Sequence, residues 1–338
     1  MNGFATTKTI FIGLTLFGTV IGSGWTNEIA VWEQSPAVQK DPSNYALTDP
    51  IQALDLRSPL RFKPLFGFEV GMISLSRSAP DSFDLVSDQN ATTLLNMNQM
   101  KGSAGAGLDA KIHFYNLFRE LPLDAEVRFF QVGDMTYRET FTAQQVIPVF
   151  FGGSPVSPSS SEEIFYQSRI RSVESNIVAR TPYRIRFLAG FRFLELDEDF
   201  RSTDNNASKL FRSRTRNNMF GGQVGAEAVL MSNSFGRILG SFKWAALDTD
   251  AKGNAVAENA STLLDGSTTS QLLDFELTGA ISLTRSFSMY AGYQGLAASD
   301  VGLVLTQSRI SDIFLPMNPI TFESAQWHGL KLGLMGTF

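Results

Sequence analysis

The segment Ala325-Gln-Trp-His-Gly-Leu-Lys-Leu-Gly-Leu-Met-Gly-Thr-Phe338 decides the fold class. Leucines recur at every second position from Leu330 to Leu334, and Lys331 lies between the first two of them. A repeat of two residues is the side-chain period of a β-strand and not that of a helix. The segment therefore predicts a strand with one apolar face and one mixed face, which ends on the aromatic Phe338.

A C-terminal strand that alternates in this way and ends on an aromatic residue resembles the closing strand of a bacterial outer-membrane β-barrel. In that class, the resemblance implies, the terminal strand is the signal read by the barrel-assembly machinery. The residues that would carry this signal here are Leu330, Leu332, Leu334 and Phe338. The alternative for this segment alone is an edge strand of a soluble β-sandwich.

Composition excludes several classes of protein. The 338 residues suffice for one large all-β domain or two average domains. The net charge of −5, without a basic block, argues against a nucleic-acid partner. The absence of cysteine excludes thiol catalysis, cysteine metal clusters and disulfides. No run after residue 25 approaches the roughly 18 apolar residues of a spanning helix, whereas a barrel needs only every second residue apolar.

The N-terminus carries a targeting pattern. Lys8 precedes an apolar core from Ile10 to Ile21, and small residues follow up to Gly24. A core this short with small residues after it predicts a cleaved signal peptide over 1–24; the alternative is a buried N-terminal helix. The proline-rich residues 25–63 lack periodicity and predict an irregular periplasmic extension, with the barrel over 64–338.

The chain after residue 63 contains ten segments that alternate like strands. They are 65–77, 103–115, 123–132, 164–179, 184–195, 215–231, 238–247, 273–283, 287–294 and 325–338. The segment 164–179 is the least regular, because Ile164 and Ile170 share a face in its first half and Val173 and Ile177 share the other face in its second half. This change of face predicts a bulge near Ser172.

The connections between these segments alternate in length. In order they are 78–102, 116–122, 133–163, 180–183, 196–214, 232–237, 248–272, 284–286 and 295–324, so every long connection is followed by a short one. An outer-membrane barrel has tight periplasmic turns and long external loops. We therefore predict an all-β protein, an up-and-down transmembrane antiparallel β-barrel of about ten strands, with twelve as the alternative, in the bacterial outer membrane.

The cost of exposing charge to lipid assigns the two faces. A Lys or Arg on the lipid face near the midplane costs about 2–4 kcal/mol, so the charged faces point inward. The predicted lumen-lining residues are Glu69, Asp109, Lys111, His113, Asp124, Glu126, Arg128, Arg186, Arg192, Gln223, Glu227, Lys243, Glu276 and Lys331. Acids and bases balance in this set, which indicates a salt-bridged interior. Barrels of about eight strands are filled by side chains, so ten strands predict a narrow lumen.

Three further stretches resemble one family. Leu188-Ala-Gly-Phe-Arg-Phe-Leu-Glu-Leu-Asp-Glu198, Asn217-Asn-Met-Phe-Gly-Gly-Gln-Val-Gly225 and Trp327-His-Gly-Leu-Lys-Leu-Gly333 are similar to strands of the outer-membrane β-barrel porin family of planctomycete-type bacteria. The resemblance covers roughly residues 60–338. It implies an outer-membrane location and a pore role, and it transfers no functional residue.

These observations predict a narrow passive pore for small solutes or ions, with outer-membrane lipid and the assembly machinery as partners. The alternative is a non-conducting structural or surface-binding barrel that acts through long external loops. A third hypothesis is a lipase-type enzyme that uses His328 with Ser324, but no spacing supplies an orienting carboxylate. We therefore expect that the protein is not an enzyme.

We also expect neither a cofactor nor a metal ion. Acidic residues of the expected external loops could attract divalent cations, but such runs are more often solvated loop. They are Asp197, Glu198, Asp199, Asp204, Asp248 and Asp250.

Overall fold

The computed structural model describes residues 65–78, 84–88, 93–96, 99–100, 103–117, 121–143, 146–148, 160–204, 209–257, 260–307 and 317–338. The predicted signal peptide, 1–24, and the predicted periplasmic extension, 25–63, lie outside the described residues. Within the described ranges, no helix has the length and hydropathy needed to cross a bilayer.

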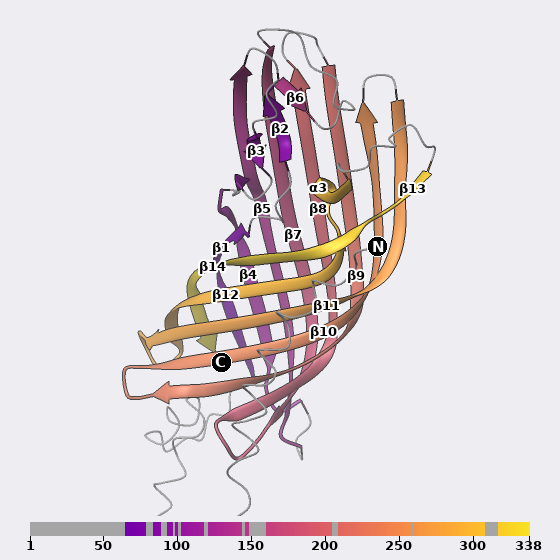
Figure 1. Cartoon of the computed structure of the whole chain (residues 1–338). Helices are drawn as coiled ribbons and strands as arrows, with labels where there is room; N and C mark the ends of the chain where they lie inside the picture. Colours follow the sequence, from indigo (N-terminus) through magenta and orange to yellow (C-terminus); the bar gives the residue numbers. More distant parts are fainter. Residues whose placement is uncertain are drawn as a thin grey trace, which may run out of the picture. The chain divides into compact units, whose positions relative to one another are not determined.

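Ten strands form the wall of a closed barrel (Figure 1). They are β1 (Phe66–Arg77), β4 (Gly105–Phe114), β5 (Leu123–Ala143), β7 (Ser160–Arg180), β8 (Ile185–Asp204), β9 (Lys209–Ser232), β10 (Gly236–Ala257), β11 (Ala260–Ser282), β12 (Phe287–Gly302) and β14 (Phe322–Thr337). Each pairs antiparallel with its neighbour in the wall, and β14 closes the ring on β1, from Gly67 opposite Thr337 to Arg77 opposite Trp327. The predicted up-and-down barrel of ten strands is confirmed.

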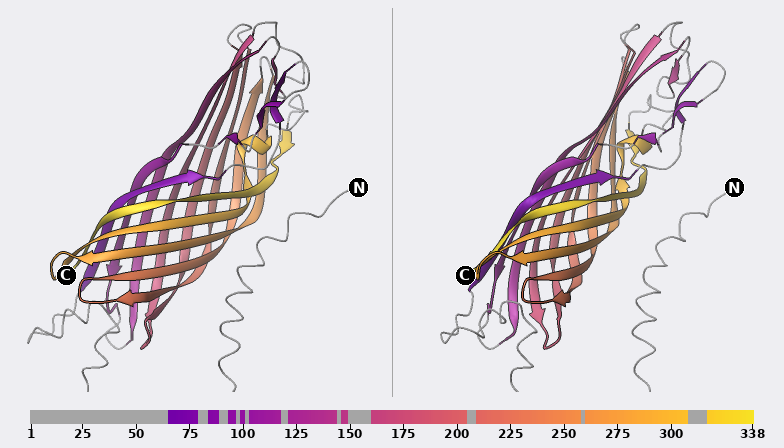
Figure 2. Two further views of the ribbon diagram at one scale, coloured as in Figure 1. Left: turned by 60° about the vertical axis from the view of Figure 1, so that its left-hand side comes forward. Right: turned by 90° about the vertical axis from the view of Figure 1, so that its left-hand side faces the viewer.

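Smaller elements accompany the wall. β2 (Asp84–Asp88), β3 (Thr93–Asn96) and β6 (Val146–Pro148) form a separate three-stranded sheet. β13 (Met317–Pro319) adds a short parallel pairing to β11, and α3 (Val304–Gln307) is a single turn of helix directly after β12. All of these belong to connections between wall strands on the side opposite the C-terminus (Figures 1 and 2).

An apolar belt surrounds the wall near the C-terminal end. On β8 the outward residues Ile185, Phe187, Phe191 and Phe193 are exposed, and the next outward residue is Glu195. At about 3.4 Å per residue and a tilt of about 40°, this stretch spans roughly 21 Å along the barrel axis, close to the roughly 25 Å lipid-facing band of outer-membrane barrels. Since the closed ladder also leaves no unpaired edge in the hydrocarbon, the protein is a β-barrel of the bacterial outer membrane.

Several strands continue well beyond this belt, and here the sequence-based boundaries are wrong (Figure 2). Much of the predicted loops 196–214 and 248–272 belongs to the hairpins β8–β9 and β10–β11, which pair without a break up to Asp204 opposite Lys209 and Ala257 opposite Ala260. Outside the membrane the outward face meets water and is polar. A search for apolar outward faces therefore ends these strands too early.

The predicted bulge near Ser172 is also wrong. β7 pairs with β8 residue for residue from Glu162 to Arg180. Ile164 and Ile170 point into the barrel, in phase with Ser172, so the change from apolar-inward to apolar-outward occurs without any slip in register. The irregularity lies on β5, where the register shifts between Val132 and Met135 and Asp134 adopts a φ of 54°.

Candidate functional site

The structure places all fourteen predicted lumen-lining residues on the inner face of the wall. From the C-terminal end outward, we distinguish four zones among the described inward residues: a periplasmic cluster, an ion-pair layer, an apolar plug and a polar collar; a further apolar cluster around Tyr166, Phe200 and Phe211 lies in the outer part. The first two zones contain the predicted residues, and the last two were not foreseen from the sequence.

The periplasmic cluster is built on β1, β4 and β5, where inward positions of adjacent strands meet side by side. Lys111 lies 3.2 Å from Glu69 and 4.0 Å from Glu126. The imidazole of His113 lies between the same two carboxylates, at 3.3 Å and 3.4 Å. Nearby, Arg186 contacts Glu227. These groups therefore pair with one another, and the acids of the cluster together with Lys111 line a pocket whose wall also includes Ser241, Thr278 and Met335.

Two further periplasmic-side contacts tie the wall to its turns. Arg180, at the end of β7, lies 3.3 Å from Asp124 on β5. The backbone N–H of Asn116 donates to the same carboxylate at 2.8 Å. Asp124 therefore supports the β4–β5 turn, and it is not part of a free aqueous path.

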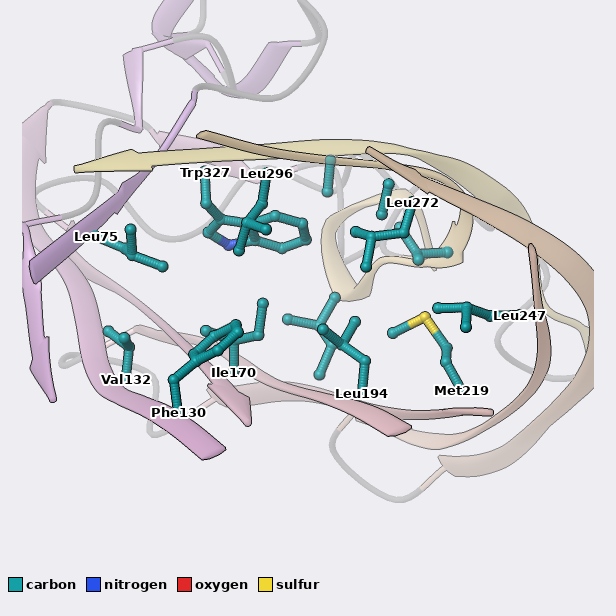
Figure 3. Close-up of a cluster of buried hydrophobic side chains, with 14 of the residues drawn as sticks. Leu75, Phe130, Val132, Ile170, Leu194, Met219, Leu247, Leu272, Leu296 and Trp327 are labelled. Carbon is teal, nitrogen blue, oxygen red and sulfur yellow. The ribbon is translucent and has the colours of Figure 1, made fainter. Parts of the chain in front are cut away.

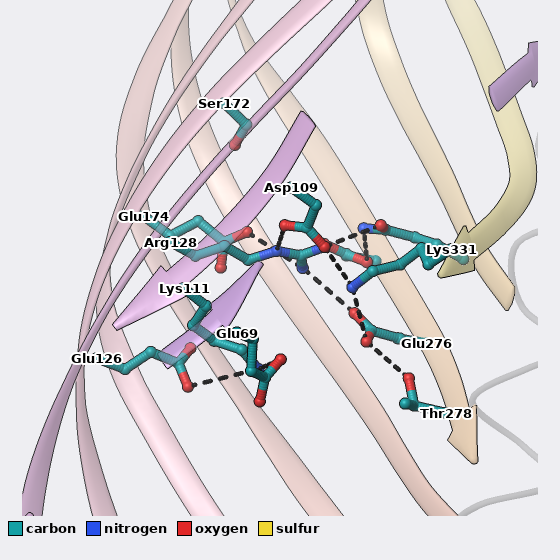
Figure 4. A network of polar contacts seen from close by, with 12 residues as sticks. Glu69, Asp109, Lys111, Glu126, Arg128, Ser172, Glu174, Glu276, Thr278 and Lys331 are labelled. Atoms are coloured by element: carbon teal, nitrogen blue, oxygen red, sulfur yellow. Dashed lines mark hydrogen bonds and ion pairs between the residues drawn. The ribbon is translucent and has the colours of Figure 1, made fainter. Parts of the chain in front are cut away.

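The ion-pair layer crosses the lumen above this cluster (Figure 4). Arg128 donates two hydrogen bonds to Asp109, at 2.9 and 3.1 Å, and a third to Gln294 on the opposite wall at 2.9 Å. Lys331 bridges Asp109 at 2.5 Å and Glu276 at 2.9 Å. These contacts link β4 with β5 and β14, β14 with β11, and β5 with β12 across the lumen.

Glu174 lies at the centre of this layer and is not among the residues predicted from the sequence. Its carboxylate lies 2.6 Å from Lys243, 3.5 Å from Arg192 and 3.8 Å from Arg128, and it is fully buried. Arg192 also donates to Asp274 at 2.9 Å, a second residue missed in the same way. An uninterrupted alternation along β7 would have found Glu174, because it lies in phase with the inward Ile170.

An apolar plug fills the lumen above the ion pairs (Figure 3). Its buried side chains come from nine of the ten wall strands and from the segment after β12: Ile73, Leu75, Phe130, Val132, Met135, Ile170, Leu194, Leu196, Met219, Ala245, Leu247, Leu272, Leu296, Ala298, Val301, Leu303, Ala325 and Trp327. Trp327 is 1% exposed and is the largest of the fully buried side chains described. The plug was not predicted from the sequence, because the lumen was expected to be polar along its whole length.

The plug and the ion-pair layer are in direct contact. The guanidinium groups of Arg128 and Arg192 lie 5.4 and 5.7 Å from the ring centroid of Phe130. A guanidinium at this distance from an aromatic face is stabilised by a cation–π interaction. Phe130, a residue of the plug, therefore contacts both cations of the ion-pair layer.

The polar collar holds the segment after β12 inside the barrel. Asn217 on β9 donates to the carbonyl of Gly302 at 2.9 Å and accepts from its N–H at 2.7 Å. Glu198 accepts from the N–H of Val304 at 2.8 Å and lies 2.6 Å from Arg77. A Cβ on Gly302 would meet Ile320 at 2.7 Å, so the segment fits closely.

The predicted assembly signal lies on the outer face of β14. Leu330, Leu332 and Leu334 are exposed in the apolar belt, and the ring of Phe338 stacks on Phe66 and Phe68 at 5.4 and 6.0 Å. Its role in assembly stays a prediction.

The geometry does not support the catalytic pair His328 and Ser324. Both side chains lie on the outer face of β14, four residues apart, which corresponds to roughly 13 Å along an extended strand. Hydrogen bonding requires about 3 Å. His328 instead packs against Tyr293, with ring centroids 6.3 Å apart.

The acidic residues expected in external loops belong to strands. Asp197 and Asp199 face outward on β8 and pair with arginines, whereas Glu198 and Asp204 face inward on the same strand. Asp248 and Asp250 lie on β10. Within the described residues, no group of three or more acidic, histidine or cysteine side chains could hold a metal ion.

No family model and no curated relative matches the chain. Similar solved structures include the outer-membrane protease OmpT from Escherichia coli, at 8% identity over 83% of this chain and 99% of that chain, with a TM-score of 0.46. The P. putida toluene transporter TodX shares 10% identity over 85% and 94%, with a TM-score of 0.32. An anion-selective porin from Comamonas acidovorans shares 8% over 82% and 100%, with a TM-score of 0.18. Similarities this weak carry no argument about activity, and the planctomycete family stays a prediction.

Proposed function

We propose that the protein is an outer-membrane barrel closed to free diffusion, which acts through the part of the barrel that extends beyond the membrane. The apolar plug is the observation that carries this proposal. A hydrated ion or polar solute that entered it would lose its hydrogen bonds to water without replacement, at a cost of several kcal/mol for each polar group.

The zone beneath the plug supports the same proposal. The charges of the ion-pair layer lie within 4 Å of opposite charges, so a passing ion would have to break buried pairs such as that between Arg128 and Asp109. Breaking a buried pair is strongly unfavourable, because it leaves an uncompensated charge in a medium of low dielectric constant.

The extended outer part supplies the surface for contact. Hairpins β8–β9 and β10–β11 continue beyond the belt as a paired wall, and buried residues such as Tyr166, Phe200 and Phe211 pack inside it. A packed wall keeps its outer side chains in fixed positions. The proposal includes no catalytic role, since His113 is paired inside the barrel and His328 packs against Tyr293 on the outer face.

A gated narrow pore is the second candidate, and one observation favours it. Val301 and Leu303, at the end of β12 and just after it, supply part of the plug on a segment that Asn217 and Glu198 hold in place. A segment held by a few hydrogen bonds is easier to withdraw than a wall strand. The charged interior beneath it would then line a path for small solutes or ions.

Planar-bilayer recordings of refolded protein separate the two candidates. A closed barrel gives no channel steps for wild type or for Asn217→Ala, whereas a gated pore gives steps that Asn217→Ala makes more frequent. Asn218→Ala is the matched control, because Asn218 is the next residue of β9 and does not face the lumen. Stable steps in wild type would overturn the closed barrel.

A further inference from the structure

Beyond the belt, the outer face of the wall carries an ordered array of charges. The register aligns Arg169, Asp197, Arg216 and Lys252 in one row across β7 to β10. Most of these charges pair one to one: Arg216 with Asp197 at 2.6 Å, Lys252 with Asp250 at 2.7 Å, and Arg169 with Asp134 at 3.0 Å. This row is therefore close to neutral.

The array is not neutral one step further from the membrane. Asp199 is approached by Arg212 at 2.7 Å, by Arg201 at 2.8 Å and by Arg214 at 3.7 Å. We call Arg201, Arg212 and Arg214 the arginine cluster. One carboxylate cannot neutralise three guanidinium groups, so the cluster carries an excess of positive charge. All three side chains remain substantially exposed, with Arg214 at 57%.

Hydrogen bonds to Asp199 hold two arginines of the cluster in position. Arg201 and Arg212 each donate two hydrogen bonds to Asp199, in the forked geometry of a guanidinium on a carboxylate. Burial alone would raise the pKa of Asp199, but the hydrogen bonds from Arg212 and Arg201 hold that pKa below its usual range. Asp199 therefore stays ionised and fixes its partners in place.

The distance of the arginine cluster from the hydrocarbon core indicates which class of lipid it can contact. Asp199 lies six residues beyond Phe193, the last apolar residue of the belt on β8. At about 3.4 Å per residue and a tilt of about 40°, this is roughly 15 Å above the edge of the hydrocarbon. Phospholipid headgroups extend only about 5–8 Å from that edge. A lipid that reaches the cluster must therefore carry a tall headgroup.

We propose that the arginine cluster binds phosphate groups on the sugar headgroup of lipopolysaccharide in the outer leaflet. The planar guanidinium matches phosphate oxygens bidentately, and the cluster offers three of them around one point. The apolar belt directly below holds the acyl chains of the same lipid, so one molecule contacts both surfaces. Asp199 occupies the centre as an internal anion and competes with the phosphate.

The test is a titration of detergent-solubilised full-length protein with phosphorylated and with dephosphorylated lipopolysaccharide. One arginine near an anionic lipid surface contributes about fivefold in affinity, so R201Q/R212Q/R214Q should bind the phosphorylated lipid at least tenfold more weakly. The dephosphorylated lipid should bind wild type and variant alike. The control R138Q/E163Q removes an arginine of the same outer face together with its own carboxylate, so it leaves the net charge unchanged and should bind the phosphorylated lipid like wild type.

A second variant works in the opposite direction and guards against misfolding. Asp199→Asn removes the competing anion, so binding of the phosphorylated lipid should become severalfold tighter. Equal affinity of wild type and the cluster variant for phosphorylated lipid overturns the proposal, as does equal affinity of wild type for the two lipids. If inorganic phosphate alone competes at micromolar concentration, or if the cluster mediates self-association, the lipid is not the ligand and the proposal fails.

Discussion

Replacing Glu174 with glutamine removes the charge at the centre of the ion-pair layer while the shape of the side chain is kept. The carboxylate is fully buried and lies within 4 Å of Lys243, Arg192 and Arg128. Removing one partner of a buried pair costs about 3–5 kcal/mol. In the variant, Arg192 still pairs with Asp274 and Arg128 still pairs with Asp109, whereas Lys243 loses its ion pair. We therefore expect the free energy of unfolding to fall by about 3 kcal/mol.

The assay is equilibrium unfolding in urea of protein refolded into lipid vesicles, followed by tryptophan fluorescence and extrapolated linearly to water. Glu163→Gln is the control, because it removes an acid of the same strand whose partner Arg138 is 68% exposed. An exposed pair contributes only about 0–1 kcal/mol. The double variant Glu174→Gln with Lys243→Met should recover part of the loss, since no uncompensated cation is then buried.

Two outcomes would refute the reasoning. If Glu174→Gln costs no more than Glu163→Gln, the layer is hydrated and the lumen is not closed by paired charges. If the double variant is less stable than Glu174→Gln, the cost does not come from the stranded charge of Lys243.

Three further predictions concern the rest of the barrel. Burial, with a smaller contribution from Asp204, raises the pKa of Glu162 in the extracellular part to about 7. Because the folded pKa lies above the unfolded value of 4.5, stability should fall by up to about 3 kcal/mol as pH rises from about 4.5 to about 7, and Glu162→Gln should abolish this dependence in urea titrations at several pH values. Trp327→Ala should cost about 3–5 kcal/mol by the same measurement, because it leaves a void in the plug, and Trp244→Ala in the lipid-facing belt should cost less. Phe338→Ala should lower the fraction of folded protein in the outer membrane of expressing cells; an unchanged fraction would remove the assembly role.

The sequence by itself determined the part of the barrel that lies in the membrane. Along segments such as Leu123–Val132, Asp124, Glu126 and Arg128 alternate with apolar residues, and lipid tolerates only one of the two faces. Strand number and the inward direction of the charges follow from that alternation and from the lengths of the connections. These properties depend on neighbouring residues of one segment, so the two-residue period of a strand is enough to predict them.

Only the tertiary structure decided the outer half of the strands and the contents of the lumen. Beyond Phe193 the outward face meets water, and Ile164 and Ile170 point inward without a bulge. The apolar face of the strand is therefore the inner one here, whereas in the membrane it is the outer one. Whether an inward residue meets water, an ion or hydrocarbon depends on the opposite wall, as Arg128 and Gln294 show across 166 positions of sequence. Closure of the ring brings such residues together, and no pattern along a single strand contains that information.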